Sequence, residues 1–250
     1  MEIVTSTLAE RPEAEPLLWQ LSGDWPTFMK QDRVADLYFP GVEHDHPEFV
    51  LLAWAADDPD TLLARGFSVP FAFGGPGREQ LPDGGWDAVI QWAHADRVHG
   101  HAPTHVSALE ILVSAAARGT GLSARMVDAM RHNASRLGFA DLVAPVRPSG
   151  KAAEPRVPMP EYAARVRPDG LPTDPWLRVH ARAGAEVVKV APVSMTVSGS
   201  LAEWRDWTGL PFDADGDVEV PGALAPVRCD VARDAAVYVE PNVWMHHRLG

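Results

Sequence analysis

The sequence contains very little cysteine, since Cys229 is the only one among 250 residues. One thiol cannot form an internal disulfide framework or a multi-cysteine metal site, and this usage is typical of a reducing compartment. No apolar run approaches the roughly 20 residues that a membrane-spanning helix needs, and the first residues lack the basic and then apolar order of a secretory signal. We therefore expect a soluble cytoplasmic protein without a membrane partner, in which Cys229 is a buried packing residue.

The sequence also lacks an excess of positive charge. Its 22 Lys and Arg residues against 34 Asp and Glu residues give a formal net charge of −12. Because such a protein repels the phosphate backbone, we expect no nucleic-acid partner. The charge is uneven, however, since residues 118–182 hold eleven Lys or Arg and six Asp or Glu, a local +5. This segment suggests a small polyanionic ligand, although such charges also occur on solvated helix faces.

The pattern of apolar residues predicts strands and helices that follow one another within one domain. Hydrophobic residues make up 46% of the chain, which is enough for a full core. Periodicity and turn residues predict strands over 49–55, 61–73, 105–113, 142–146, 185–190 and 195–197, helices over 86–97, 122–137 and 176–183, and partial helices in 17–21 and 25–37. We interpret residues 201–250 as an extension packed on a domain of residues 1–200.

Proline is concentrated in one segment. Eight of the 23 prolines lie between residues 145 and 175, and their density excludes a continuous helix or a central strand. We expect a long ordered loop or lid there, with one helical turn near residues 161–165. Chemistry often takes place under such loops.

One turn has the composition of a phosphate site. Between the strand that ends at Val113 and the next helix, the chain has the sequence Arg118-Gly119-Thr120-Gly121-Leu122-Ser123. Backbone N–H groups at the positive end of a helix bind phosphate oxygens. Glycines adopt a positive φ and let a ligand approach the backbone closely, and Arg118 adds a fixed positive charge. The turn therefore predicts a ligand that carries phosphate.

Two other phosphate-binding patterns compete for this turn. Residues 119–124 fit the dinucleotide pattern G-x-G-x-x-A, and Asp141 lies 20 positions beyond Gly121. A ribose-binding carboxylate belongs at the far end of the following strand, whereas Asp141 precedes the strand predicted over 142–146. A nucleotide-dependent oxidoreductase is therefore a weaker alternative. The Walker pattern fails because the chain has no Gly-Lys-Ser or Gly-Lys-Thr.

The turn resembles the coenzyme A loop of the GCN5-related N-acetyltransferases, Gln/Arg-x-x-Gly-x-Gly/Ala. Arg118 and Gly121 match it, and Ser123 departs from it with another small side chain. The resemblance implies an α/β fold with a mixed, mostly antiparallel sheet, two splayed central strands and helices on both faces. It also implies acetyl-CoA or another acyl-CoA as co-substrate, bound by the backbone of Leu112 and Val113 and by the turn 118–123.

A second segment, residues 177–188, resembles the closing helix and turn of this family. There, a Tyr four residues before a Gly donates a proton to the leaving thiolate. Here His180 precedes Gly184 by four residues. Because the ordinary pKa of histidine is about 6.5, the resemblance implies that His180 acts as the acid. The alternative is a packing histidine without proton transfer.

The general base of the family corresponds to a position six residues before Val113, which is Ser107, a poor base. Ser107 could relay through water to His105 on the same face of the strand, whereas Glu110 faces the other way by alternation. His105 and Glu110 are therefore competing bases, with an ion pair of Glu110 and simple packing of His105 as structural alternatives. A bulge near Leu112 or Val113 is expected to direct a backbone N–H at the thioester carbonyl.

The resemblance covers about residues 49–198 and implies an acyl-CoA-dependent N-acyltransferase for a small-molecule amine. A catalytically silent module of the same fold that binds coenzyme A or a metabolite is the alternative. Neighbouring histidines, such as His44 with His46 or His99 with His101, suggest a metal site only weakly, because no distant ligand set accompanies them. The acceptor, the acyl chain length and the oligomeric state are left open, a homodimer being one possibility.

Overall fold

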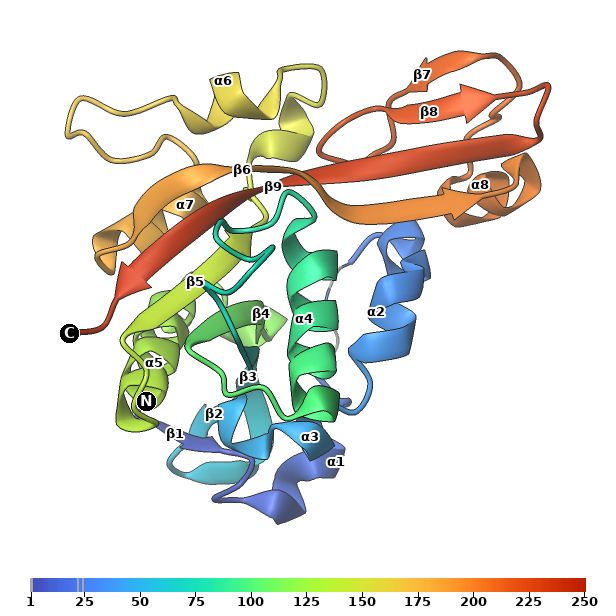
Figure 1. Ribbon diagram of the computed structural model, residues 1–250. Coiled ribbons are helices and arrows are strands. Elements are labelled where there is room, and N and C mark those ends of the chain that lie inside the picture. Colours follow the sequence, from blue (N-terminus) through green and yellow to red (C-terminus); the bar gives the residue numbers. More distant parts are fainter. Residues whose placement is uncertain (1, 22, 24) are drawn as a thin grey trace.

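The computed structural model describes residues 2–21, 23 and 25–250 (Figure 1). Within them, nine strands form one mixed, mostly antiparallel sheet in the order β1-β2-β3-β4-β5-β9-β8-β7, and β6 pairs with β9. The strands are β1 (Ile3–Thr7), β2 (Val50–Ala55), β3 (Asp58–Phe71), β4 (His105–Val113), β5 (Asp141–Val146), β6 (Glu186–Gly199), β7 (Gly216–Val218), β8 (Val227–Asp230) and β9 (Ala235–Arg248). The helices are α1 (Glu15–Leu18), α2 (Arg33–Tyr38), α3 (Val42–Asp45), α4 (Gly85–His99), α5 (Leu122–Arg136), α6 (Met159–Ala163), α7 (Pro175–Arg182) and α8 (Leu201–Thr208).

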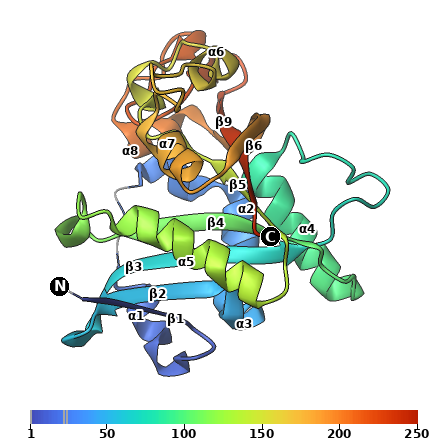
Figure 2. The ribbon, with the colours of Figure 1, turned by 90° about the vertical axis from the view of Figure 1, so that its left-hand side faces the viewer.

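Helices cover both faces of the sheet, as predicted. Helix α5 lies across one face, which Figure 2 shows from that side. Its apolar side chains, such as Met126 and Met130, are buried against β2, β3 and β4. Helix α4 packs on the other face, where Val89 and Ile90 join a core with Leu18 and Trp244. Among the described residues, no helix is long and apolar enough to cross a membrane.

The two central strands separate after a short contact. The parallel strands β4 and β5 pair only at Val106 with Leu142 and at Ser107 with Val143. Beyond these pairs β5 continues along β9, with which it pairs over its whole length. A gap therefore opens between β4 and β5 toward their carboxyl ends, and the predicted splay of the central strands is confirmed.

Strand β4 contains a bulge, but at a different position from the one predicted. Glu110 pairs with Phe67 and Ala108 pairs with Ser68, so Leu109 is the extra residue. Leu112 and Val113 pair regularly with β3, and the bulge expected there was wrong. One extra residue reverses the alternation of side chains. Glu110 therefore lies on the same face as Leu109 and Ser107, and the prediction that it faces the other way was also wrong.

The chain beyond residue 200 contributes to the central sheet. Strand β9 lies between β5 and β8 and pairs along β6, which is one irregular strand where two were predicted. The Pro-rich segment 145–175 is an ordered loop with α6, and the predicted turn at 161–165 overlaps this helix. Asp174 fixes the loop by accepting hydrogen bonds from the Tyr162 hydroxyl at 2.9 Å and the Gly150 N–H at 2.8 Å.

Two buried carboxyl groups join α2 to α4. Asp32 caps α2 by accepting the N–H groups of Val34 and Ala35, and Asp87 of α4 accepts the Thr196 N–H at 3.2 Å. Each has one buried oxygen without a hydrogen-bond donor among the described residues. Burial and the nearby Asp32 carboxylate raise the pKa of Asp87 to about 8. The pair therefore holds one proton at neutral pH.

This proton makes stability depend on pH. Because the unfolded chain releases it at about pH 4, the free energy of unfolding should fall as pH rises from about 4 to 8, by up to about 1.4 kcal/mol per pH unit. Asp87→Asn should remove this fall, since its amide donates to Asp32 without titrating. Urea unfolding of both proteins at several pH values measures the slope. Asp36→Asn, on the exposed side of α2, should keep it, and parallel curves for Asp87→Asn and the parent would contradict the assignment.

Candidate active site

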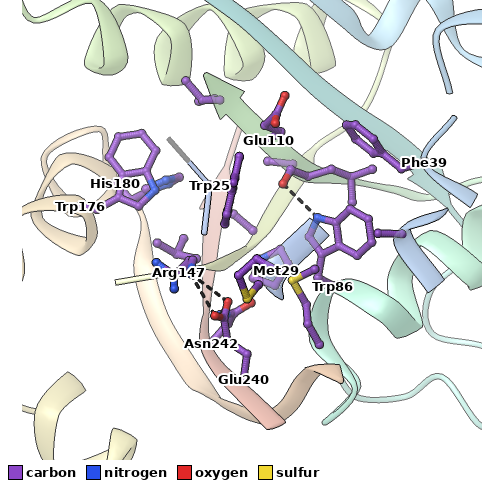
Figure 3. A pocket seen from close by; sticks show the side chains of 18 of the residues that line it. Trp25, Met29, Phe39, Trp86, Glu110, Arg147, Trp176, His180, Glu240 and Asn242 are labelled. Atoms are coloured by element: carbon purple, nitrogen blue, oxygen red, sulfur yellow. Dashed lines mark hydrogen bonds and ion pairs between the residues drawn. The ribbon is translucent and has the colours of Figure 1, made fainter. Parts of the chain in front are cut away.

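A cavity of about 240 Å³ lies in the gap between β4 and β5 (Figure 3). Residues 108–111 of β4 and residues 144–147 around the end of β5 form its two sides, and the segment 25–39 covers it. Helix α7 adds Trp176 and His180, and β9 adds Glu240 and Asn242. The splayed sheet thus creates the cavity, and the segment 25–39, α4, α7, β6 and β9 close it.

Aromatic rings form much of the cavity wall. Trp25, Phe39, Trp86 and Trp176 all line it (Figure 3). The Trp86 indole N–H donates to the Leu109 carbonyl at 3.0 Å, which ties α4 to the bulge of β4. Ring faces carry partial negative charge and attract cations. Sequence reasoning missed this group, because its members come from distant elements.

Glu110 faces the cavity from β4 as half of an ion pair. Its Oε2 accepts from Arg65 Nε at 2.8 Å, and both side chains are almost buried. Arg65 also donates to the Leu18 carbonyl at 2.5 Å and lies over the Trp19 ring. The structural alternative for Glu110, an ion pair, is thus observed. Its role as a general base stays a prediction.

A second ion pair lies on the opposite wall. Glu240 is fully buried, and its Oε2 and Oε1 accept from Arg147 Nε at 3.0 and 3.1 Å, respectively. It also accepts from the Tyr238 hydroxyl at 2.9 Å and the Asn242 amide at 3.1 Å. The Arg147 guanidinium is 5.6 Å from the Trp25 ring centroid. No local sequence pattern indicates this network, since Arg147 and Glu240 are 93 residues apart.

His180 lines the cavity from α7 but is only 4% exposed. Its Nδ1 lies 3.0 Å from Nε2 of His247, and its ring contacts Trp176 edge-on. Burial, together with the positive charge that His247 takes up on protonation, lowers the pKa of His180 to about 3. Only about one molecule in 10⁴ then carries an imidazolium at pH 7. His180 is therefore almost entirely neutral at this pH, which does not support a role as proton donor. That role stays a prediction.

The other two predicted catalytic residues lie outside this cavity. Ser107 is fully buried, and its hydroxyl donates to the Ala108 carbonyl at 3.3 Å. His105 and His246 line a different cavity of about 290 Å³. Asp141 Oδ2 lies 3.8 Å from His105 Nε2, and Asp141 Oδ1 lies 2.7 Å from His246 Nε2. The described residues contain no cluster of three His, Cys, Asp or Glu side chains that could hold a metal.

The glycine turn precedes α5 as a cradle of exposed backbone. Gly119 and Gly121 have φ angles of +77° and +83°, and a Cβ at either would meet no described atom within 4 Å. The first helical hydrogen bond runs from Arg125 N to Gly121 O, so the N–H groups of residues 122–124 point out of the helix end. Thr120 donates its hydroxyl to the Ala117 carbonyl at 2.6 Å. This geometry fits a phosphate-bearing ligand such as coenzyme A.

Backbone donors connect the cradle to the cavity. The Ser114 N–H donates to the Leu63 carbonyl of β3 at 2.8 Å. Because N–H groups alternate along an antiparallel strand, those of Val113 and Ile111 point away from β3 and into the gap. The N–H of Leu112 points toward β3 instead. Of the two residues expected to contact the donor through their backbone, Val113 has the suitable direction.

Comparisons with known proteins agree with this geometry. No protein-family model matches the chain. The chain is 34% identical, over 97% of its own length and 93% of the relative's, to the arginine N-acetyltransferase avaD of Aspergillus versicolor. The loading GNATL domain of CurA from Lyngbya majuscula has the same fold, with a TM-score of 0.59 and 15% identity over 100% of this chain and 98% of that domain. The GNAT-like decarboxylase GphF in complex with isobutyryl-CoA is similar too, with a TM-score of 0.56 and 17% identity over the full length of both chains. The chain belongs to the GCN5-related N-acetyltransferase superfamily and is an N-acyltransferase that uses an acyl-CoA to acylate an amine.

Proposed function

We propose that the acceptor is arginine or an arginine-like cationic amine, bound in the cavity between β4 and β5. The observation that carries this proposal is the set of four aromatic rings around the cavity. A guanidinium stacks on such rings more favourably than a neutral group does. The activity named for the relative from Aspergillus versicolor, arginine N-acetylation, supports the same acceptor class.

The ion pairs of the cavity add polar contacts at its two ends. Glu110 offers carboxylate oxygens near the bulge, and Arg147 offers a guanidinium that is 23% exposed. Each is already paired with a partner of opposite charge, so neither end carries a large free charge. An acceptor that carries both a cation and a carboxylate can place its cation beside Glu110 and its carboxylate beside Arg147. No buried charge is then left without a partner of opposite charge.

On the donor side, we assign the turn 118–123 to the phosphates of the acyl-CoA and the N–H of Val113 to its pantetheine arm. When bound, the acyl-CoA supplies an activated thioester carbon. The Ile111 N–H, which faces the gap, donates to the carbonyl oxygen and stabilises its developing charge. The amine nitrogen bonds to that carbon, the carbon–sulfur bond breaks, and one proton passes from nitrogen to sulfur.

The donor assignment is tested at Gly119. Gly119→Ala places a methyl group in the cradle and should raise the KM for acetyl-CoA about tenfold, which corresponds to about 1.4 kcal/mol. Steady-state thiol release measures it. Gly100, at the end of α4, has a φ of +68° and equally open surroundings. Gly100→Ala therefore imposes a similar backbone strain and should leave this KM unchanged; equal effects of the two variants would refute a cradle.

The acceptor assignment is tested by an amine panel with acetyl-CoA. Arginine and agmatine should release coenzyme A, whereas citrulline, which has nearly the shape of arginine but no positive side chain, should have a kcat/KM at least about tenfold lower. Mass spectrometry identifies the acylated product. Equal use of citrulline and arginine would rule out recognition of the cation, and no acylation of any cationic amine would overturn the acceptor class.

A tryptophan variant links the result to the cavity. Trp25→Leu should raise the KM for arginine about tenfold with little change in kcat, because a ring contact made equally in the ground and transition states is lost. Trp92 of α4 is the matched control, since its ring packs against the Arg78 guanidinium and does not line the cavity. If Trp92→Leu raises this KM as much as Trp25→Leu, the rings of the cavity do not bind the acceptor.

A further inference from the structure

Arg147 lines the cavity and still has hydrogen-bond donors to offer. Its Nε donates to both carboxylate oxygens of Glu240, at 3.0 and 3.1 Å, and its Nη2 donates to the Gly222 carbonyl at 2.6 Å. Its Nη1 makes no hydrogen bond within the described part of the chain. The side chain is 23% exposed. Because every guanidinium nitrogen carries N–H groups, Nη1 is left for a ligand in the cavity.

Glu240, the partner of Arg147, has no capacity left for a cation. It is 0% exposed, and each of its oxygens has a second donor: Oε1 accepts from the Asn242 amide at 3.1 Å and Oε2 from the Tyr238 hydroxyl at 2.9 Å. The Asn242 oxygen is also in use, since it accepts the Ser194 hydroxyl at 2.6 Å. This side of the cavity therefore offers a ligand mainly donors.

Glu110 gives the opposite character to another side of the cavity (Figure 3). Its Oε2 accepts from Arg65 Nε at 2.8 Å, whereas its Oε1 lies 3.4 Å from Arg65 Nη2. The Glu110 side chain is 12% exposed. A carboxylate oxygen with one long hydrogen bond can still accept from a cation or an N–H group. One side of the cavity thus accepts hydrogen bonds, and the side at Arg147 donates them.

Charge balance favours a carboxylate as the group that Arg147 binds. Arg147 and Glu240 neutralise each other, so an added carboxylate brings one more negative charge. Lys30 lines the same cavity from the segment Thr27–Gln31, and it has no hydrogen bond or ion pair with any residue that the structure describes. Its ammonium compensates that charge. A guanidinium also matches a carboxylate in shape, because neighbouring N–H groups can bind both oxygens.

We propose that Arg147 is a specificity-determining residue that binds the α-carboxylate of the acceptor and selects amino acids over amines without a carboxylate. This rests on the proposed function, in which the cation of the acceptor is bound by the aromatic rings and Glu110. Glu240 and the Gly222 carbonyl hold the guanidinium in place before the ligand arrives. Binding then costs little side-chain entropy at Arg147. An acceptor such as arginine is oriented by both of its charged ends.

A comparison of arginine with argininamide tests this selection, because the amide has nearly the shape of arginine but no negative charge. The parent should prefer arginine in kcat/KM by about 10- to 100-fold, as expected for hydrogen bonds to a charged group. Arg147→Lys keeps a cation for Glu240 but lacks the planar fork, so the preference should fall below about threefold. Each preference compares two substrates on one protein, so any loss of folded protein cancels.

The matched control is Arg78→Lys. Arg78 pairs with the buried Asp96 at 2.6 Å, its side chain is 20% exposed, and it is not among the residues that line the cavity. This variant should keep the preference of the parent. The proposal is wrong if the parent uses both substrates equally, or if Arg147→Lys keeps the full preference. A raised KM for acetyl-CoA with an unchanged preference would place Arg147 on the donor side instead.

Binding without catalysis separates this proposal from the proposed function. Calorimetry in the presence of coenzyme A compares arginine, argininamide, norleucine and norleucinamide. If norleucine binds as tightly as arginine, and both bind more tightly than their amides, the cationic acceptor class is wrong and the carboxylate site stands. If arginine and argininamide bind equally and better than norleucine, the acceptor class stands and the carboxylate site is wrong. Binding of none of these ligands would contradict both.

Discussion

The contact between β4 and β5 is limited to two residue pairs, and the whole site depends on that limit. Parallel strands normally continue side by side, which leaves no room between them. Here β5 follows β9 instead, and the backbone of β4 beyond Ser107 loses its neighbour on one side. The N–H groups that point into the gap and the cavity are two results of the same separation. The glycine turn lies at the far end of this gap, where β4 gives way to α5.

Charges in the walls are compensated before any ligand arrives. Glu110 is held by Arg65, and the fully buried Glu240 is held by Arg147. A lone buried carboxylate would cost several kcal/mol of free energy, so each needs its cation. Because these charges are already paired, the aromatic faces provide the main attraction for a cationic acceptor. The pairing also fixes the Arg147 side chain in the wall and holds the Arg65 side chain against Glu110.

Local patterns predicted the strand and the helix on either side of the glycine turn well, and topology determined what they could not. Strand β4 and the start of α5 lie where periodicity placed them, because alternation, glycines and a helical repeat are adjacent in sequence. The bulge at Leu109 has no such signal, and one extra residue was enough to turn Glu110 to the cavity. His180 was found by resemblance. Its partner His247, 67 residues later, becomes visible only when β9 pairs with β5.

The position of β9 has a consequence for how the site forms. This strand follows all others in the chain, yet it lies inside the sheet and supplies Glu240, Asn242 and His247. Helix α5 packs on β2, β3 and β4, which all precede it in the chain, whereas β9 must find β5 across about 100 residues. The wall of the cavity that holds Glu240 and Asn242 is therefore complete only after β9 has paired with β5. Until then this side of the cavity is open to water.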